Sequence, residues 1–430
     1  MKYLFGVLII ASAFISCKSK NSKIVDKVYV DSLINHYTLP KIVQDNDADM
    51  QFWKNRIDPK QTRQVNESKY AATLISRFHF FGDIQDIKKA DSIYHNINKA
   101  YNNSLSSPFV ALTSTAMLQH HFRQADTLFE QAKKLGVDKF TLTTLLFDVN
   151  FELGRYPIAG AYLKQLKSAK DYSYFFRRSK YDHFTGTLDS AISAMNKASN
   201  LARNSDYLKG IALSNEADLN IHAGDLQKAA DIYKECIKIN SADFHSILGL
   251  GWVALAHDKN DTLAEKIYKF VLTKNKLPDP LFKLYQMAQQ RGDKNLEKRY
   301  AEDFIAKATD TVYGRMYNKY VIEILTGILN NPAKAEALAK DELNNRATPQ
   351  TYAWYVYTLY MNGKKNEAYK VFQQHVSGQP LEGLELYYMG KMMKGLDKGY
   401  NAEEFFKAAD KNKYDLSSAM AVDLEKSLEE

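Results

Sequence analysis

The fold is decided by a ten-residue stretch, Gly363-Lys364-Lys365-Asn366-Glu367-Ala368-Tyr369-Lys370-Val371-Phe372. Glycine readily adopts the left-handed backbone that ends a helix. Ala368 and Phe372 are four positions apart, so they share one face of the helix that follows. The small alanine lets a neighbouring helix approach closely, and the aromatic ring fills the space beside it. We therefore predict a tight turn followed by a helix that packs on its predecessor.

The small position of this pattern recurs along the chain. It is occupied in order by Ala90, Ala125, Ala159, Ala191, Ala229, Ala264, Glu297, Ala335, Ala368 and Ala402. Nine steps separate the first from the last, 312 residues apart, which is a mean spacing of about 34.7. A period near 34 residues with this chemistry is the signature of helix-turn-helix repeats. We therefore predict an all-α solenoid of about ten such units over residues 68–415.

The repeat resembles the tetratricopeptide-repeat (TPR) family. The residues that carry the resemblance are Gly224-Asp225 with Ala229 and Tyr233, Gly292-Asp293, Gly363 with Ala368 and Phe372, and Met389-Gly390 with Ala402, Phe406 and Ala409. The resemblance implies a right-handed superhelix. The chain departs from the family pattern at Glu297, Ala301 and Ala339. Two stretched intervals of 38 residues suggest joints near residues 204–210 and 309–315.

Composition and motifs exclude several classes of function. The 430 residues are 45% hydrophobic and 25% charged, with a net charge of +8 and interleaved signs. Aromatic and basic residues form no stacked platform, so we expect no nucleic-acid partner. Metal-ligand spacings, nucleotide loops and nucleophile elbows are absent from the sequence. We therefore expect no metal, no cofactor and no enzymatic activity.

Three smaller motifs have simple structural interpretations. The stretch Gly249-Leu250-Gly251-Trp252 imitates a dinucleotide-binding loop, but it lies inside a predicted helix, where glycines favour close helix contacts. His120-His121 is interpreted as a pair of solvated turn histidines. Cys236 is expected to be a small buried side chain.

Residues 1–16 are predicted to be an export signal peptide. Lys2 precedes an apolar run that is too short to span a membrane, and the run ends in Phe14-Ile15-Ser16-Cys17. This ending resembles a bacterial lipobox. The resemblance implies cleavage before Cys17 and lipid attachment there, which would anchor the protein to a membrane. An ordinary signal peptide with an incidental cysteine remains the alternative.

Residues 17–67 are predicted to be a tether followed by an N-terminal cap. The tether has no acidic residue up to Lys23, which favours an outer-membrane anchor facing the periplasm of a bacterial cell envelope. Beyond it we expect a helix over residues 25–37 and an acidic loop over Asp45–Asp49. Trp53 should cover the first repeat. Residues 416–430 should form a capping helix at the other end.

In this family the first helix of each unit lines the concave groove. The resemblance therefore implies groove-facing positions at Phe176, Lys180, His183, Asp218, Gln286, Gln289, Tyr357, Tyr360 and Lys391. Such a mixture suits an extended peptide or a helix laid in the groove, although plain solvation of these residues is the alternative.

Our functional hypothesis is a lipid-anchored scaffold that binds protein or peptide partners, in which charge reversal at Lys180 and Lys391 weakens partner capture. The alternative is a glycan- or nutrient-binding outer-membrane lipoprotein. Six Asp-Ser/Thr-apolar triplets, among them Asp91-Ser92-Ile93, resemble a bacterial O-glycosylation signal, with repeat periodicity as the other explanation.

Overall fold

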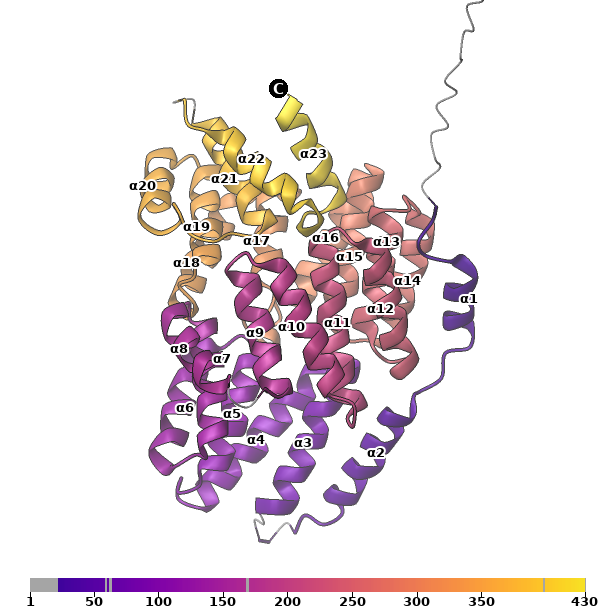
Figure 1. Ribbon diagram of the computed structural model, residues 1–430, viewed down its shortest axis with the longest axis vertical. Helices are drawn as coiled ribbons and strands as arrows, with labels where there is room; N and C mark the ends of the chain where they lie inside the picture. Colours follow the sequence, from indigo (N-terminus) through magenta and orange to yellow (C-terminus); the bar gives the residue numbers. More distant parts are fainter. Residues whose placement is uncertain (1–21, 59, 62–63, 168–169, 397–398, 430) are drawn as a thin grey trace, which may run out of the picture.

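The computed structural model describes residues 22–58, 60–61, 64–167, 170–396 and 399–429. The predicted signal peptide and Cys17 lie outside the described residues. All regular elements of the described part of the chain are helices, and most of them pair into consecutive hairpins (Figure 1). This confirms the predicted all-α, TPR-like helical-repeat fold.

Ten hairpins follow one another in the described part of the chain. In order they are α3 (Gln64–Phe81) with α4 (Ile84–Ala100), α5 (Ser106–Leu118) with α6 (Phe122–Leu135), α7 (Lys139–Glu152) with α8 (Tyr156–Leu166), α9 (Tyr172–Phe184) with α10 (Leu188–Leu201), α11 (Asp206–His222) with α12 (Leu226–Ile239), α13 (Phe244–Ala256) with α14 (Asp261–Lys274), α15 (Asp279–Arg291) with α16 (Lys294–Ala308), α17 (Asn318–Thr326) with α18 (Pro332–Asn345), α19 (Pro349–Met361) with α20 (Lys365–His375), and α21 (Gly383–Gly395) with α22 (Ala402–Lys411).

The recurring small position is buried at the contact between helices. Eight of its alanines, from Ala90 to Ala368, are completely buried, and Ala402 is partly buried. Glu297 is also buried, and its carboxylate pairs with Lys294 at 2.7 Å. The predicted turn glycines have left-handed backbones, with φ of 77° at Gly224 and 78° at Gly363. The small position that repeats in the sequence therefore corresponds to a buried contact between helices in nearly every unit.

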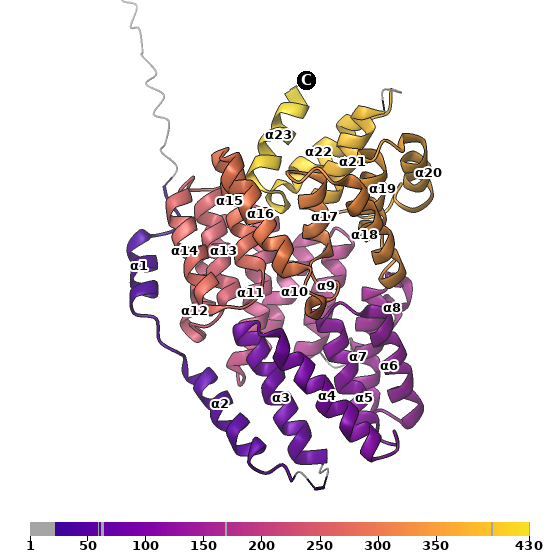
Figure 2. The ribbon, with the colours of Figure 1, turned by 180° about the vertical axis from the view of Figure 1, so that it is seen from behind.

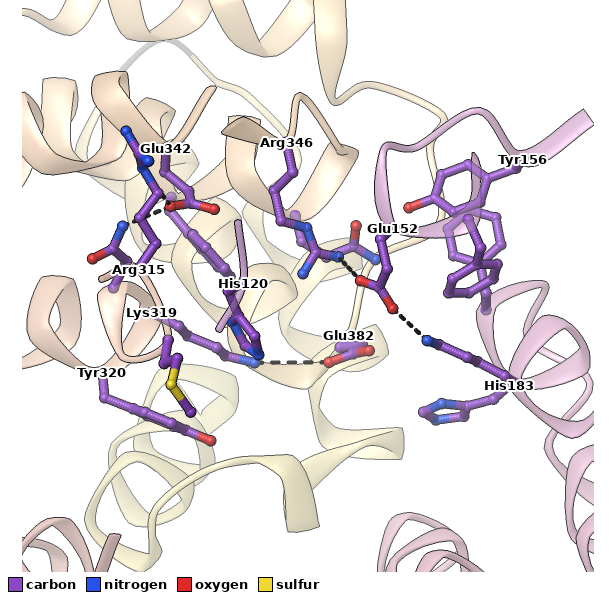
Figure 3. A pocket seen from close by; sticks show the side chains of 17 residues that line it. His120, Glu152, Tyr156, His183, Arg315, Lys319, Tyr320, Glu342, Arg346 and Glu382 are labelled. Atoms are coloured by element: carbon purple, nitrogen blue, oxygen red, sulfur yellow. Dashed lines mark hydrogen bonds and ion pairs between the residues drawn. The ribbon is translucent and has the colours of Figure 1, made fainter. Parts of the chain in front are cut away.

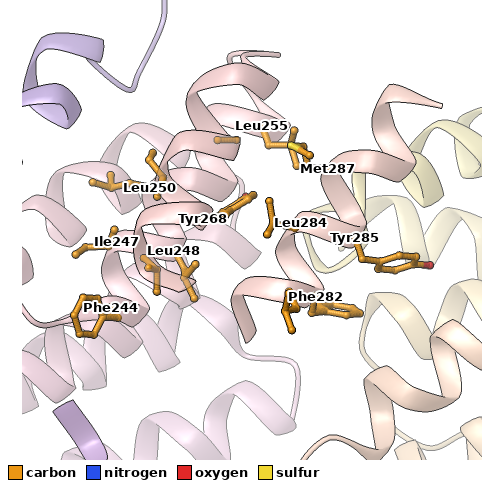
Figure 4. Close-up of a cluster of buried hydrophobic side chains, with 14 of the residues drawn as sticks. Phe244, Ile247, Leu248, Leu250, Leu255, Tyr268, Phe282, Leu284, Tyr285 and Met287 are labelled. Atoms are coloured by element: carbon orange, nitrogen blue, oxygen red, sulfur yellow. The ribbon is translucent and has the colours of Figure 1, made fainter. Parts of the chain in front are cut away.

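A large cluster of buried hydrophobic side chains includes residues of α13, α14 and α15 (Figure 4). Gly251 of α13 faces the buried ring of Tyr268, and a Cβ atom at Gly251 would lie 2.4 Å from that ring. Gly249 lies equally close to Tyr233. The loop-like glycine motif is therefore a helix-packing device, as predicted. Cys236 is a buried free thiol, which confirms the second interpretation.

Residues 24–54 form a strap along one side of the hairpins, and we call them the N-terminal strap. It contains α1 (Lys27–Asn35), which packs on α14, and α2 (Lys41–Lys54), which packs on α3 (Figure 1). At its start, Asp258 accepts the backbone N–H groups of Ile24 and Val25, both at 2.9 Å. The strap therefore joins the sixth hairpin to the first.

The predicted acidic loop over Asp45–Asp49 is wrong, because these residues lie within α2. Helical spacing places the apolar Val43, Met50 and Trp53 of α2 toward the hairpins. Burial of these side chains stabilises the helix more than the acidic run destabilises it. Val43 is completely buried. Met50 and Trp53 pack against the core of the first hairpin.

The superhelix closes on itself, so that units far apart in sequence touch. Lys276 follows α14, and its backbone N–H donates to the carbonyl of Phe81, the last residue of α3, at 2.8 Å. Asn345, at the end of α18, bonds to the turn between α5 and α6. Figures 1 and 2 both show α18 next to α8. These contacts between distant units narrow the concave side of the superhelix.

The segment after α22 adds further contacts between distant hairpins. A short 3-10 helix, η1 (Thr311–Tyr313), precedes α17, and a second one, η2 (Lys413–Asp415), follows α22. Asp415 of η2 pairs with His222 of α11. The final helix α23 (Ser418–Glu429) packs on α22 and α15 and buries Leu424 completely. Among the described residues, no helix combines the length and apolar character needed to cross a membrane.

Candidate binding chambers

Among the described residues, the concave side includes two neighbouring cavities, which we call the first and second chambers. The first chamber has a volume of about 300 Å³ and is lined from α7, α9 and α17–α19 (Figure 3). The second has a volume of about 320 Å³ and is lined mainly from α11, α13, α15, α17 and η2. Lys319, Tyr320 and Glu382 line both. Cavities of this size can hold a small ligand or a few side chains.

A chain of charges crosses the first chamber. Glu152 bonds to Lys180 on one side, and its other oxygen lies 3.4 Å from Arg346 (Figure 3). Burial alone would raise the pKa of Glu152. The positive charges of Lys180 and Arg346 outweigh burial and lower the pKa of Glu152 to about 2. Glu152 is therefore ionised at neutral pH, and it links the third, fourth and eighth hairpins.

Two polar atoms of the first chamber have no hydrogen-bond partner among the described residues. They are Nε of Arg346 and Oε1 of Gln350, and both are buried. An unpaired buried polar group costs about 1–3 kcal/mol. The chamber therefore offers one donor and one acceptor to a bound group, beside aromatic rings such as the stacked pair Tyr156 and Phe184.

The second chamber carries a hydrogen-bonded acid at one edge. Asp218 accepts the Tyr233 hydroxyl at 2.6 Å and pairs with the His245 ring at 2.9 Å. Asp218 raises the pKa of His245 to about 9, so the pair is ionic at neutral pH. The carboxylate of Asp218 therefore already has partners within the protein.

Two groups of opposite charge in the second chamber, Lys283 and Glu323, have no ion-pair partner among the described residues. Oε1 of Glu323 is buried and has no hydrogen-bond partner among the described residues. Burial raises the pKa of Glu323 to about 7, although Lys319 and Lys283 oppose the shift. Lys283 lines the same chamber, and burial lowers its pKa. Shifts of this kind are frequent at functional sites.

Four of the nine predicted groove residues line the chambers. Lys180 and His183 line the first, and Asp218 and Gln286 line the second. His183 also lies 4.9 Å, ring to ring, from His222, and burial followed by the His222 charge lowers the pKa of His183. The inward-facing positions of α9, α11 and α15 therefore bring these four residues to the chambers.

The other five predicted residues are engaged within the chain. Gln289 accepts the Ser417 hydroxyl at 3.0 Å, and Lys391 bonds to Asp423 at 2.9 Å, so both meet the segment that ends in α23. The remaining three pack on aromatic or glycine neighbours: Phe176 stacks on Tyr172, Tyr357 stacks on Tyr388, and Tyr360 lies against Gly395. As the structure describes the two chambers, none of these five residues lines either of them.

Sequence reasoning missed several chamber residues. The interpretation of His120 as a solvated turn histidine is wrong, because it lines the first chamber and burial lowers its pKa to about 4. Glu152, Lys319, Glu323 and Arg346 were not predicted. Arg346 meets Glu152 only because distant hairpins of the superhelix touch, and no local sequence pattern encodes that contact. Within the described residues, no cluster of three or more His, Cys, Asp or Glu side chains could hold a metal ion.

Comparisons with known proteins concern the fold alone. A tetratricopeptide repeat protein from Parabacteroides merdae is 14% identical over 60% of this chain and 99% of its own, with a TM-score of 0.35. Pseudomonas aeruginosa PilF is 10% identical over 50% of this chain and 97% of its own, with a TM-score of 0.36. Human IFIT1 with PPP-AAAA is 13% identical over 76% of each chain, with a TM-score of 0.47. No family model and no curated protein matches the sequence.

Proposed function

We propose that the protein is a lipid-anchored scaffold of the bacterial cell envelope that binds a protein or peptide partner in its chambers. The observation that carries the proposal is the pair of buried, unpartnered groups in the first chamber, Arg346 Nε and Gln350 Oε1. One donor and one acceptor in the same chamber match the C=O and N–H groups of a peptide. The binding role, and not catalysis, is what this arrangement supports.

The enclosure limits the form of the partner. An extended peptide or a long helix needs an open groove, whereas the contacts from Asn345 and Lys276 close this one. A cavity of about 300 Å³ accepts a few side chains. We therefore propose that a short, protruding segment of the partner enters the first chamber.

The start of the described chain bears on the proposed anchor. Asp258 holds the backbone of Ile24 and Val25 beside the turn between α13 and α14. A lipid on Cys17 would be joined to this point by a tether of seven residues, which reaches roughly 25 Å at most when fully extended. We propose that this turn faces the outer membrane from the periplasmic side. Cys17→Ser should release the protein from the membrane fraction, whereas retention there would contradict lipid anchoring.

Partner capture provides the test of the binding role. We expect Lys180→Glu to break the charge chain with Glu152 and to reduce the set of proteins crosslinked in cells, as identified by mass spectrometry. Lys391→Glu is the matched control, because Lys391 is engaged by Asp423 outside the chambers. Equal capture by wild type and Lys180→Glu, with both folded by circular dichroism, would contradict a partner in the first chamber.

A further inference from the structure

The second chamber contains a positive and a negative group that do not neutralise each other. Lys283, on α15, makes no ion pair and no hydrogen bond with any of the described residues, although Asp279, Asp218 and Glu323 act on it electrostatically. Glu323, on α17, is 5% exposed, and its Oε1 atom is unpaired. Both side chains line the same cavity.

The neighbouring carboxylates are already engaged, which singles out Glu323. Asp218 is held by Tyr233 and His245, and Asp279 accepts the Tyr317 hydroxyl at 2.6 Å. Lys319 lies 3.6 Å from Glu385 and 3.8 Å from Glu382, so it is also compensated. Lys283 and Glu323 are therefore the charges of this chamber that remain available to a ligand.

Apolar side chains form a further part of the wall. Trp252, Phe282 and Leu248 line the chamber from α13 and α15, and Met420 closes it from α23. This combination provides two opposite polar points with an apolar surface beside them. The volume of about 320 Å³ is suited to a molecule of a few to about fifteen non-hydrogen atoms.

We propose that the second chamber binds a small zwitterion, a free α-amino acid or a dipeptide, with its ammonium group at Glu323 and its carboxylate at Lys283. A ligand with only a positive charge would leave Lys283 unpaired and be repelled by it. A ligand with only a negative charge would leave Glu323 unpaired. A zwitterion pairs both buried groups at once, and pairing is what makes a buried charge tolerable. The apolar wall receives the side chain of the ligand.

This site is independent of the partner segment proposed for the first chamber. Its ligand is a diffusible small molecule, and its determinants are Lys283 and Glu323, not Lys180 or Arg346. Loss of partner capture in cells therefore says nothing about it, and binding by the purified chain says nothing about the partner.

Isothermal titration calorimetry on the purified chain tests the proposal at pH 8, where Glu323 is mostly ionised. The probes are leucine, phenylalanine and the dipeptide Ala-Leu, together with N-acetyl-leucine and leucine amide, which each lack one charge. We expect at least one zwitterion to bind, and both single-charge analogues to bind at least about tenfold more weakly, equivalent to 1.4 kcal/mol.

Substitutions assign the two ends of the ligand. Glu323→Gln should weaken the zwitterion about tenfold and leave N-acetyl-leucine unchanged, and Lys283→Met should weaken the zwitterion and leave leucine amide unchanged. Lys238→Met, at an exposed position on α12, is the matched lysine control and should bind as wild type does. If Lys283→Met does not fold, Lys283→Gln replaces it. The proposal is overturned if no zwitterion binds, if capped analogues bind equally well, or if the substitutions leave binding unchanged.

Discussion

Asn345 provides the sharpest test of the closed superhelix. Its Oδ1 atom accepts the backbone N–H of Phe122 at 3.0 Å, and its Nδ2 atom donates to the carbonyl of His120 at 2.8 Å and to Glu342 at 2.9 Å. The side chain is 3% exposed. Two of these bonds join the eighth hairpin to the second. Asn345→Leu removes all three while keeping a side chain of similar size.

The size of the effect follows from the groups left unpaired. The Phe122 N–H is buried, and it would lose its partner together with the His120 carbonyl. Each such loss costs about 1–3 kcal/mol. Because His120 is only partly buried, water can satisfy its carbonyl in part. We therefore expect Asn345→Leu to lower the free energy of unfolding by about 2–4 kcal/mol.

Urea unfolding gives the size of the loss, and hydrogen exchange with mass spectrometry gives its location. In an open solenoid each unit depends on its neighbours alone, so the effect would stay within the eighth hairpin. In the closed form we expect exchange to rise also at the Phe122 amide, 223 residues away.

Asn344→Leu is the matched control, since Asn344 contacts Arg123 through its backbone carbonyl at 3.3 Å and its side chain is exposed. Unchanged exchange at Phe122 in Asn345→Leu, with a stability change below about 0.5 kcal/mol, would refute the closed superhelix in solution.

Three further substitutions test single features. Since burial raises the pKa of Glu323 from 4.5 to about 7, its contribution to stability is full below pH 4.5 and is lost as the pH rises through 7. Glu323→Gln should remove this pH dependence of urea unfolding, a change of up to about 3 kcal/mol, and an unaltered profile would contradict it. Gly251→Ala should cost about 1–3 kcal/mol in thermal or urea unfolding through overpacking, whereas Gly210→Ala, with open space around its Cβ, should not destabilise. Asp258→Ala removes two backbone hydrogen bonds of the N-terminal strap. We expect faster tryptic cleavage of the strap with the hairpins still folded, and equal cleavage would count against the strap contact.

The hairpins could be predicted because each one repeats the same local chemistry. Ala229 fills a contact between helices, Tyr233 lies against Gly249, and Gly224 turns the chain with φ of 77°. Each of these roles depends on residues within about one repeat length. A periodic sequence therefore contains nearly all the information that the hairpin stack requires.

The chambers could not be predicted in the same way. The repeat pattern correctly predicted that Lys180, His183, Asp218 and Gln286 face the concave side, because the first helix of each unit lies on that side. The partner of Lys180, Glu152, comes from a neighbouring hairpin, whereas the second cation on Glu152 comes from the eighth. That contact depends on the accumulated curvature of many units, which small packing differences set, and no single motif records it.

Closure also explains why charged groups can remain unpaired inside a repeat protein. In an open groove, water would solvate Lys283 and Glu323, and their pKa values would stay near those of exposed side chains. Here the contact of Asn345 with the second hairpin and the contact of Asp415 with the fifth keep distant hairpins in place around these groups. The closure therefore holds polar groups in position before a ligand arrives, so that little ordering remains to be done on binding. The interactions that close the superhelix and those that recognise a ligand are consequently two parts of the same structure, and loosening the first should weaken the second.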